Sequence, residues 1–542
     1  MSDAMDSHNI GHTLTRIAHS QPERIGLICN KHGQYKQWTF SELESIVQSF
    51  CHDLHRRGIS KGTRVMLMVQ PGLEFIGLAF ALFRLGAVVI LIDPGMGFRN
   101  LFGCIGSARP EVFIGTPKAI LFKRLFASHF TTVKQTIIIH PWSGLGRRAS
   151  AALRQTPATG PDDLAAIIFT TGSTGPPKGV CYTHAIFQAQ LDFIHDYYGI
   201  GPTDIDQPAF PLFALFSIGL GAAVVIPEMN PARPAKVNPA KFIRTIKQFN
   251  VTYSFGSPAI WNRVSRYCLD HGLMLPSLRK VLMAGAPVTG DLLARVKAML
   301  PEEAEIHTPY GATESLPTTD ITGHEILTRT WPLTRQGKGT CVGRPLPGNR
   351  VRIIAIDDGP ITAWDDHLLL PTREIGEIVV QGLAVTKAYD HNEPENRLAK
   401  IPDQGAFWHR MGDVGYLDLD GRLWVCGRKA HRVITSQGTL FPLPCEAICN
   451  TLPGILRSAL VGVGTPPDQT PVLIVELLDK GQNQARLLGD LKEMAARQPL
   501  LSNIRHFLIH DEFPTDIRHN VKIFREKLAV WAATRVDRKG EK

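Results

Sequence analysis

Strand-like and helix-like segments alternate through roughly the first four hundred residues, and this alternation limits the possible fold more than any other feature. Residues 39–58 have helical periodicity, with Ser41 as the expected N-cap and Gly58 as the expected stop. The strand-like RVMLMV follows, then a helix-like stretch over residues 73–85 and the β-branched AVVILI. This order predicts an α/β fold of layered, mostly parallel sheets.

The pattern of expected elements changes after about residue 347, where short β-like segments such as GEIVVQG and GRLWVCG replace the alternation of strands and helices. A smaller α/β pattern, with ALVGVG and PVLIVEL as strands, begins near Lys429. At 542 residues the chain is also too long for one compact core. We therefore expect a large N-terminal domain of layered α/β sheets plus a β subdomain, residues 1–428, and a small α+β C-terminal domain, residues 429–542.

Composition and charge narrow the class of function. The net charge of +10 comes from basic residues scattered among acidic ones, and no long Lys/Arg run indicates a nucleic-acid partner. The nine cysteines form no CxxC pair and the N-terminus has no apolar signal segment, so we expect a reducing cytoplasm. Two apolar stretches, residues 74–94 and 211–227, are interrupted by Arg84 or bounded by prolines, which favours core packing over a membrane span.

The segment FTTGSTGPPKG, residues 169–179, follows the strand-like AAIIF. Glycines let backbone N–H groups point into one cavity and hydroxyls add donors, so the loop is suited to wrap a polyphosphate. The order differs from a Walker A loop because Lys178 lies between Pro177 and Gly179, and a flexible surface turn is the alternative interpretation. The candidate phosphate-binding residues are Thr170, Thr171, Gly172, Ser173, Thr174, Gly175 and Lys178.

This loop resembles the signature of the adenylate-forming superfamily, which includes acyl-CoA ligases, luciferases and peptide-synthetase adenylation domains. Two further motifs of that family follow in order, AGAP at residues 284–287 and PYGATES at residues 309–315. In the family the tyrosine packs on adenine, the threonine binds phosphate and the glutamate holds Mg²⁺. The resemblance implies ATP-binding positions at Gly285, Ala286, Pro287, Tyr310, Gly311 and Thr313, and a Mg²⁺ site at Glu314 and Thr171.

The stretch HRMGDVGYLDLDGRLWVCGRK carries the next family motif. By resemblance, Asp413 accepts hydrogen bonds from both ribose hydroxyls and Arg428 reaches ribose or phosphate. The family fold adds a small mobile C-terminal lid, which we expect to hinge here between Arg428 and His431. ATP and Mg²⁺ are the cofactors that the resemblance implies.

A second lysine is expected late in the chain, where the family's lysine bridges the substrate carboxylate and the α-phosphate. Lys522 in FPTDIRHNVKIFREKL matches it, although the spacer from Pro514 is two residues longer and Val521 replaces the usual glycine. A carboxylate and ATP repel each other, so this reaction depends on positioning and on neutralised charge. The resemblance gives catalytic roles to Lys522, Thr171 and Glu314.

Three departures separate the chain from ligases that pass the acyl group to a thiol. His431 stands at the hinge pivot with Ile434 where lysine is usual, Ala214 replaces a frequent histidine in PLFALF, and DIRHN occupies the catalytic-lysine loop. Together with VIPEMNPARPA, TPYGATESLP and FPTDIRHNVKIFREKLAVWA, these departures resemble the olefin β-lactone synthetases of bacterial long-chain hydrocarbon synthesis. In that family a 2-alkyl-3-hydroxy fatty acid is adenylated and its own 3-hydroxyl displaces AMP to give a β-lactone.

The resemblance thus implies an ATP-dependent ligase for a small-molecule 3-hydroxy fatty acid, with an NADPH-dependent reductase upstream and a β-lactone decarboxylase downstream as pathway partners. The second nucleophile already belongs to the substrate, so no thiol has to enter, and intramolecular attack gains effective concentration. A long-chain fatty-acyl-CoA or acyl-carrier-protein ligase is the alternative within the family. A non-catalytic adenylate-binding scaffold is the alternative from another class.

Two further sets of residues are candidates by type alone. A general base for the hydroxyl is not identifiable from sequence, because a histidine without a positioned partner is weak evidence for proton transfer. The histidines that could serve are His184, His431 and His519, each with a structural or surface role as the alternative. The residues that could line an acyl channel are Phe210, Phe213, Phe216 and Phe255, each with core packing as the alternative.

Overall fold

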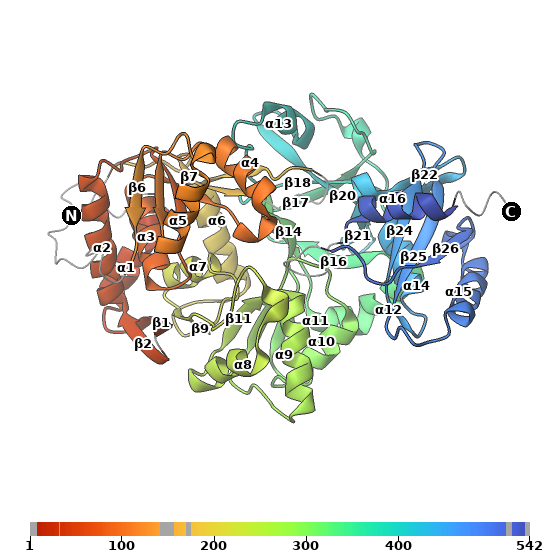
Figure 1. Ribbon diagram of the computed structural model, residues 1–542, viewed down its shortest axis with the longest axis horizontal. Helices are drawn as coiled ribbons and strands as arrows, with labels where there is room; N and C mark the ends of the chain where they lie inside the picture. Colours follow the sequence, from red (N-terminus) through yellow and green to blue (C-terminus); the bar gives the residue numbers. More distant parts are fainter. Residues whose placement is uncertain (1–7, 32, 141–156, 170–174, 516–522, 537–542) are drawn as a thin grey trace.

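The structure, a computed structural model, describes residues 8–31, 33–140, 157–169, 175–515 and 523–536. These residues form five β-sheets with helices packed around them. Along the longest axis, the N-terminal helices lie at one end and the C-terminal helices at the other (Figure 1).

The first sheet holds both ends of the glycine-rich loop. Its strand order is β6-β5-β3-β4-β7-β8. The bounds are β3 Arg64–Met68, β4 Val88–Leu91, β5 Val112–Gly115, β6 Gln135–Ile138, β7 Leu164–Phe169 and β8 Gly179–Thr183. Neighbouring strands are parallel except β7 and β8, which are antiparallel and pair Phe169 with Gly179. The loop therefore begins and ends at two residues that lie side by side.

The second sheet has the order β13-β12-β11-β9-β10-β1-β2 and is parallel except for the β1–β2 pair. The bounds are β1 Ile25–Lys31, β2 Gln34–Thr39, β9 Ile205–Asp206, β10 Ala223–Val225, β11 Tyr253–Gly256, β12 Lys280–Met283 and β13 Glu305–His307. Helices α8 (Pro239–Gln248), α9 (Pro258–Asp270) and α10 (Gly290–Lys297) connect the later strands, as the strand–helix alternation predicts.

Helix α3 (Leu73–Arg84) explains the first apolar stretch. Every residue from Phe75 to Arg84 is buried. Arg84 is paired with Glu44 of α2 (Phe40–Arg56), and its terminal nitrogens lie 2.8 and 2.5 Å from the two carboxylate oxygens. A bidentate pair of this kind satisfies both charges inside the core. Over the described ranges, no helix has both the length and the apolar character that crossing a membrane requires.

The expected N-cap of α2 is wrong by two residues. The Thr39 hydroxyl accepts a hydrogen bond from the Glu42 backbone N–H at 3.1 Å, and the Glu42 carboxylate accepts one from the Thr39 N–H at 2.8 Å. Ser41 and Glu44 have the same spacing, but Glu44 is engaged by Arg84 and does not complete a capping box. The predicted stop is confirmed, because the helix ends at Arg56 and Gly58 has a φ of +82°.

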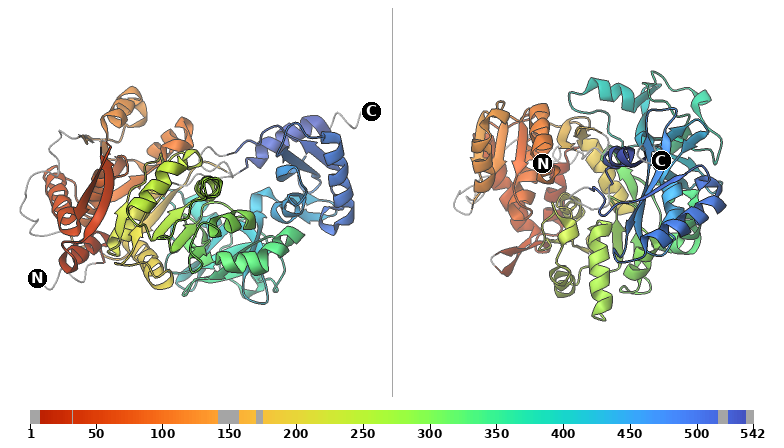
Figure 2. Two further views of the ribbon diagram at one scale, coloured as in Figure 1. Left: turned by 90° about the horizontal axis from the view of Figure 1, so that it is seen from below. Right: turned by 45° about the vertical axis from the view of Figure 1, so that its right-hand side comes forward.

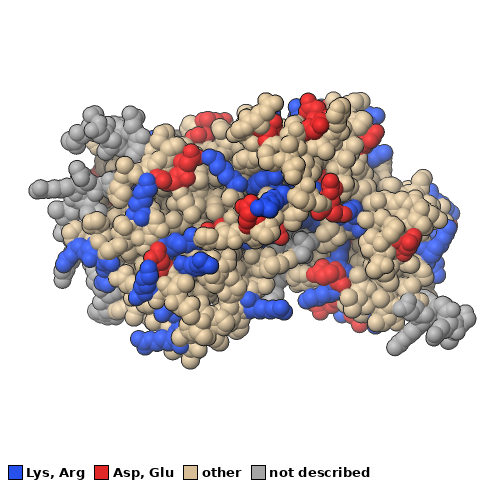
Figure 3. Space-filling model, turned by 90° about the horizontal axis from the view of Figure 1, so that it is seen from above, with Lys and Arg blue, Asp and Glu red and all other residues tan. Residues whose placement is uncertain are grey.

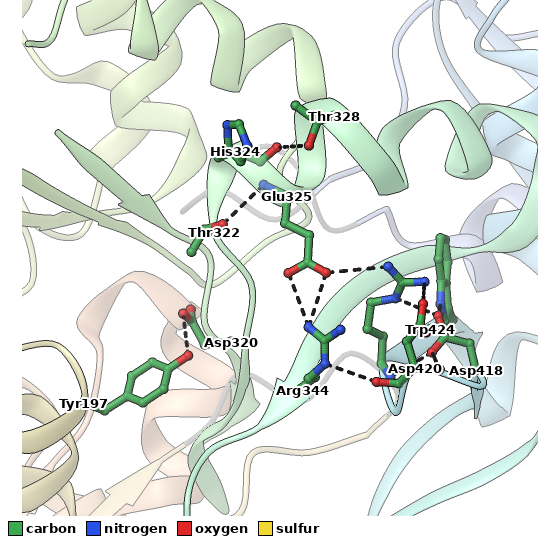
Figure 4. Close-up of polar contacts among 11 residues, drawn as sticks. Tyr197, Asp320, Thr322, His324, Glu325, Thr328, Arg344, Asp418, Asp420 and Trp424 are labelled. Atoms are coloured by element: carbon green, nitrogen blue, oxygen red, sulfur yellow. Dashed lines mark hydrogen bonds and ion pairs between the residues drawn. The ribbon is translucent and has the colours of Figure 1, made fainter. Parts of the chain in front are cut away.

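The third sheet is antiparallel and follows the path β14-β15-β16-β21-β20-β18-β17, with β19 paired to β20. The bounds are β14 Tyr310–Ala312, β15 Ser315–Asp320, β16 Thr340–Pro345, β17 Arg350–Ile354, β18 Gly376–Gln381, β19 Lys400–Asp403, β20 Ala406–Leu417 and β21 Leu423–Arg428. Figure 4 shows Glu325 next to Arg344, at a distance of 3.3 Å. Glu325 also lies 3.5 Å from Arg422, which pairs with Asp418 at 2.7 Å.

The described residues after Lys429 form a β-hairpin, a three-stranded sheet and three α-helices. The bounds are β22 Val433–Thr435, β23 Gly438–Leu440, α14 Pro442–Cys449, β24 Ile455–Val463, β25 Thr470–Leu477, α15 Gln484–Arg497, β26 His506–Ile509 and α16 Arg525–Val536. The sheet β24-β25-β26 packs its buried side chains into two apolar clusters formed wholly within this segment. Both views of Figure 2 place it beside the antiparallel sheet.

The layered α/β sheets and the added antiparallel sheet confirm the predicted fold class. The division into domains at residues 428 and 429 stays a prediction. On the face drawn in Figure 3, lysine and arginine side chains stand in small groups with acidic side chains near several of them.

Candidate active site

The lysine of the glycine-rich loop is linked through a tyrosine to the carboxylate predicted to bind magnesium. Lys178 Nζ is 2.5 Å from Glu395 and lies over the Tyr389 ring, 5.1 Å from its centre. The Tyr389 hydroxyl donates a hydrogen bond of 2.8 Å to Glu314 Oε1. A β-bridge between Val180 and Tyr389 brings this tyrosine to the loop. The structure therefore joins Lys178 and Glu314 through a residue that no motif indicated.

The rest of the loop can be placed only by its ends. Gly175 is described and exposed, whereas Thr170, Thr171, Gly172, Ser173 and Thr174 lie outside the described residues. Their predicted contacts with ATP and Mg²⁺ stay predictions.

The PYGATES turn has a backbone that admits only glycine at one position. A Cβ atom on Gly311 would lie 2.3 Å from the Ser315 carbonyl oxygen, closer than real Cβ contacts come. The Tyr182 hydroxyl donates to the Thr313 carbonyl at 2.5 Å, and the Thr386 N–H donates to the Glu314 carbonyl at 2.8 Å. These bonds from the neighbouring strand and loop fix the turn, so Glu314 is presented by a rigid backbone.

A buried lysine that the sequence did not suggest lies close to this turn. Lys400 Nζ donates to the Thr386 carbonyl and lies 5.0 Å from the centre of the Phe407 ring. Burial lowers the pKa of Lys400 to about 7, and the negative charge of Glu314 opposes this shift. No sequence signal could have found this residue, since a lone lysine at a strand start has no distinctive pattern.

Tyr310, Asp413 and Arg428, three residues of the family motifs, lie in contact. The Tyr310 hydroxyl donates to Asp413 at 2.6 Å, and Arg428 Nε lies 3.2 Å from the other Asp413 oxygen. Asp413 and Arg428 are register partners on β20 and β21, so strand pairing creates the contact. Burial and the Asp413 charge hold the Tyr310 pKa far above its usual value, and Asp413 raises the pKa of Arg428. Gly285, Ala286 and Pro287 follow β12, and Gly285 has a φ of +92°.

Described residues next to the expected hinge and next to the late lysine segment carry charges that act on His431. A β-bridge joins Thr515 to Ile523, while Lys522 and His519 lie outside the described residues. Arg525, just after the loop, forms a bidentate pair with Glu446 at 2.9 and 2.7 Å. Burial, then the charges of Arg525 and Arg428, lowers the pKa of His431 to about 4.

The two candidate histidines that the structure describes, His184 and His431, each have a buried Nε2 without a partner among the described residues. His184 is fully buried, accepts from the Ile10 N–H at 3.3 Å and packs edge-on against Phe83, which is a structural environment. Burial lowers the pKa of His184 to about 4. His184 and His431 are therefore neutral at pH 7.

A small apolar hollow lies next to the PYGATES turn. Its lining residues are Gln190, Ile194, Tyr198, Phe213, Phe216, Tyr253, Phe255, Leu282, Pro309, Leu316 and Pro317. Phe213, Phe216 and Phe255, three of the four candidates for an acyl channel, line this hollow. Phe210, the fourth candidate, is not among the lining residues and packs on Phe213 with ring centres 5.9 Å apart. Ala214 is fully buried in α7 (Phe213–Gly219).

The carboxylate of Glu314 fits a magnesium ion whose other ligands include phosphate oxygens of a nucleotide. Among the described residues no three His, Cys, Asp or Glu side chains cluster as a metal cage. Mg²⁺ commonly takes one or two carboxylates and completes its shell with phosphate oxygens and waters, which the single carboxylate of Glu314 allows.

Comparisons with known proteins identify the family and the fold. Residues 14–390 match the family model described as AMP-binding enzyme. The O-succinylbenzoate coenzyme A synthetase of Bacillus subtilis, solved with ATP and magnesium, superposes with a TM-score of 0.76 at 21% identity, covering 95% of this chain and 99% of its own. The amide bond synthetase McbA of Marinactinospora thermotolerans gives a TM-score of 0.77 at 22% identity, covering 96% and 99%. At these identities the likeness concerns the fold.

Two curated relatives are much more similar in sequence. The olefin β-lactone synthetase of Xanthomonas campestris pv. campestris is 43% identical, covering 97% of each chain. The olefin β-lactone synthetase of Stenotrophomonas maltophilia is 41% identical, covering 98% of this chain and 99% of its own. A paired Asp413–Arg428, a fixed PYGATES turn and this similarity lead to one conclusion: the chain belongs to the AMP-binding, adenylate-forming enzymes, in the group of the olefin β-lactone synthetases.

Proposed function

We propose that this chain is an ATP-dependent olefin β-lactone synthetase. It adenylates a long-chain 2-alkyl-3-hydroxyalkanoic acid and releases pyrophosphate, and the substrate's 3-hydroxyl then displaces AMP. The observation that carries this proposal is the identity of 41–43% along nearly the whole chain with two enzymes of that name. The apolar lining of the hollow next to the Glu314 turn suits the alkyl part of such an acid.

The roles of the site residues form part of the proposal. The loop from Thr170 to Gly175 and Lys178 hold the phosphates, Asp413 and Arg428 hold the ribose, and the 285–287 segment with Tyr310, Gly311 and Thr313 completes the nucleotide site. Glu314 and Thr171 would hold Mg²⁺, which supplies charge neutralisation when bound. Lys522 bridges the carboxylate and the α-phosphate, so that two anions can approach each other.

Ring closure needs no second substrate. The 3-hydroxyl oxygen forms a bond to the acyl carbon, the bond from that carbon to the AMP oxygen breaks, and the hydroxyl proton passes to solvent or a base. Because the nucleophile is tethered, its effective concentration offsets part of the strain of the four-membered ring. The chain's contribution is to hold the acyl adenylate in place and keep water away.

We also propose that residues 429–542 act as a lid over residues 1–428. Lys429 lies 3.1 Å from Glu377 and Arg432 lies 2.5 Å from Asp358, so the two residues that flank the expected pivot are bound to the antiparallel sheet and its loops. An NADPH-dependent reductase that supplies the hydroxy acid and a β-lactone decarboxylase that consumes the product are the proposed pathway partners, in the cytoplasm.

The test is incubation with ATP, Mg²⁺ and a 2-alkyl-3-hydroxyalkanoic acid without coenzyme A, followed by NMR of the product. We expect a β-lactone and one AMP for each lactone formed. Strict dependence of acid consumption on coenzyme A or acyl-carrier protein would identify an acid–thiol ligase instead. Absence of pyrophosphate exchange with every carboxylic acid tried would favour a non-catalytic adenylate-binding scaffold.

A further inference from the structure

Gln190 is a polar side chain in the wall of the apolar hollow. It belongs to α6 (His184–Asp192) and is only 5% exposed. Its Nε2 donates a hydrogen bond of 2.8 Å to the Leu316 carbonyl. Its Oε1 is buried and has no partner among the residues that the structure describes. A buried carbonyl without a donor is costly, so this acceptor requires an explanation.

The orientation of the Gln190 amide follows from its neighbour. The Leu316 carbonyl can only accept, so the Gln190 atom that faces it must be the nitrogen. The other amide atom is therefore the oxygen, and a group that satisfies it must be a donor. Most of the other lining residues, such as Phe213, Phe216, Phe255 and Leu282, offer apolar surface and no hydrogen bonds.

Gln190 is also bonded to the segment that carries Glu314. Leu316 is two residues after Glu314, and Leu316 lines the hollow together with Pro317. Tyr182, which precedes α6 on β8, bonds the Thr313 carbonyl of the same turn. An acid activated beside Glu314 with its alkyl chains in the hollow would carry its first three carbons past Gln190.

We propose that Gln190 Oε1 accepts a hydrogen bond from the 3-hydroxyl of the substrate, so that Gln190 selects hydroxy acids over acids without that group. This inference rests on the proposed function, because it assumes a 3-hydroxy acid. A hydroxyl that donates to an amide oxygen keeps its own lone pairs free to face the acyl carbon. An amide oxygen does not take the proton, so Gln190 is a specificity and positioning residue and not the general base.

The neighbouring Tyr198 offers a matched control. Tyr198 lines the same hollow and its hydroxyl is also buried without a partner among the described residues. Burial and then the negative charge of Asp320 hold the Tyr198 pKa far above its usual value. Replacing Tyr198 by Phe removes a buried polar atom from the same wall without touching the Gln190 acceptor.

The experiment compares ATP–pyrophosphate exchange for two acids of equal chain length, one with a 3-hydroxyl and one without. We expect the wild-type enzyme to prefer the hydroxy acid in kcat/KM by about tenfold or more, since a buried acceptor left unpaired penalises the deoxy acid. Gln190→Met should lower the preference for the hydroxy acid about tenfold, because Met keeps the volume and removes the acceptor. Loss of the Nε2 bond to the Leu316 carbonyl affects both acids alike and leaves their ratio unchanged. Tyr198→Phe should keep the wild-type preference.

Exchange with the deoxy acid shows that Gln190→Met is folded and can adenylate. An equal fall for both acids, an unchanged preference in Gln190→Met, or no preference in the wild-type enzyme would each overturn the inference. Product NMR separates it from the proposed function. If wild-type enzyme makes no lactone but its preference for the hydroxy acid is lost in Gln190→Met, the proposed function fails and Gln190 recognition stands. If lactone forms and the preference persists in Gln190→Met, only the recognition by Gln190 fails.

Discussion

The two halves of the candidate site differ in how their polar groups are satisfied. On the nucleotide side, Asp413 already accepts from Tyr310 and pairs with Arg428. On the acyl side, Gln190 Oε1 is buried without a partner among the described residues. The nucleotide side is therefore preorganised by internal contacts, and the acyl side leaves a group whose partner the substrate can supply. In the proposed site, binding of ATP and choice of acid therefore fall to different residues.

The largest effect is expected from a substitution of Lys522. We expect Lys522→Ala to lower adenylation by at least about a hundredfold, because no other cation would bridge the carboxylate and the α-phosphate. Pyrophosphate exchange with a 3-hydroxy acid measures this effect. Near-normal turnover would mean that the two-residue-longer spacer from Pro514 places a different residue at the reaction centre.

The second-largest effect, a rise in KM for ATP, is expected from a substitution of Asp413. Asp413→Asn keeps the shape of the side chain but leaves Arg428 without its carboxylate, and we expect KM for ATP to rise about thirtyfold. The matched control is Asp418→Asn, which weakens the ion pairs of Figure 4 and should leave KM for ATP unchanged. Equal changes in both variants would indicate that Asp413 acts through stability alone. Steady-state kinetics with varied ATP gives the answer.

A pH effect is expected at the hinge. Burial and two arginines hold the His431 pKa at about 4, against an ordinary value of 6.5. Between these values the unfolded chain binds more protons than the folded one, so stability falls as the pH drops from 6.5 to 4. His431→Leu should remove part of this fall, at most about 1.4 kcal/mol per pH unit. Urea unfolding at several pH values measures it, and parallel curves for both proteins would contradict the prediction.

The smallest effect should come from Tyr389. Tyr389→Phe removes the 2.8 Å hydrogen bond to Glu314 but keeps the ring under Lys178, and one such bond corresponds to a rise of about fivefold in KM for the magnesium complex of ATP. Tyr416→Phe is the control, because its hydroxyl donates at 2.8 Å to the Lys338 carbonyl. No change in the Tyr389 variant would show that the nucleotide side is less tightly preorganised than its contacts suggest.

The contrast between the two halves also explains what could be predicted from the sequence. Motif residues such as Asp413 and Arg428 were found because each lies in a distinctive contiguous string, and their contact follows from the pairing of β20 with β21. Tyr389 and Lys400 were missed, since their positions depend on a β-bridge to Val180 and on burial below the Glu314 turn. A linear pattern carries no trace of such long-range contacts.

The acyl side was harder to predict from the sequence, because its contacts are also long-range. Three of the four expected phenylalanines line the hollow, but Gln190 comes from a helix more than a hundred residues before the Leu316 carbonyl that it bonds. The helix start at Thr39 was missed for a different reason. Two Ser/Thr–Glu pairs have the same spacing, and only the buried partner Arg84 decides which glutamate is available.

The bridge between Thr515 and Ile523 has a consequence for how the family can vary. When two residues are paired, the free energy of closing the segment between them grows only slowly with its length. Added residues then lengthen the segment without displacing either anchor. Two additional positions before Lys522 are therefore compatible with an unchanged pairing of Thr515 and Ile523. A difference in length at this point is poor evidence against shared chemistry.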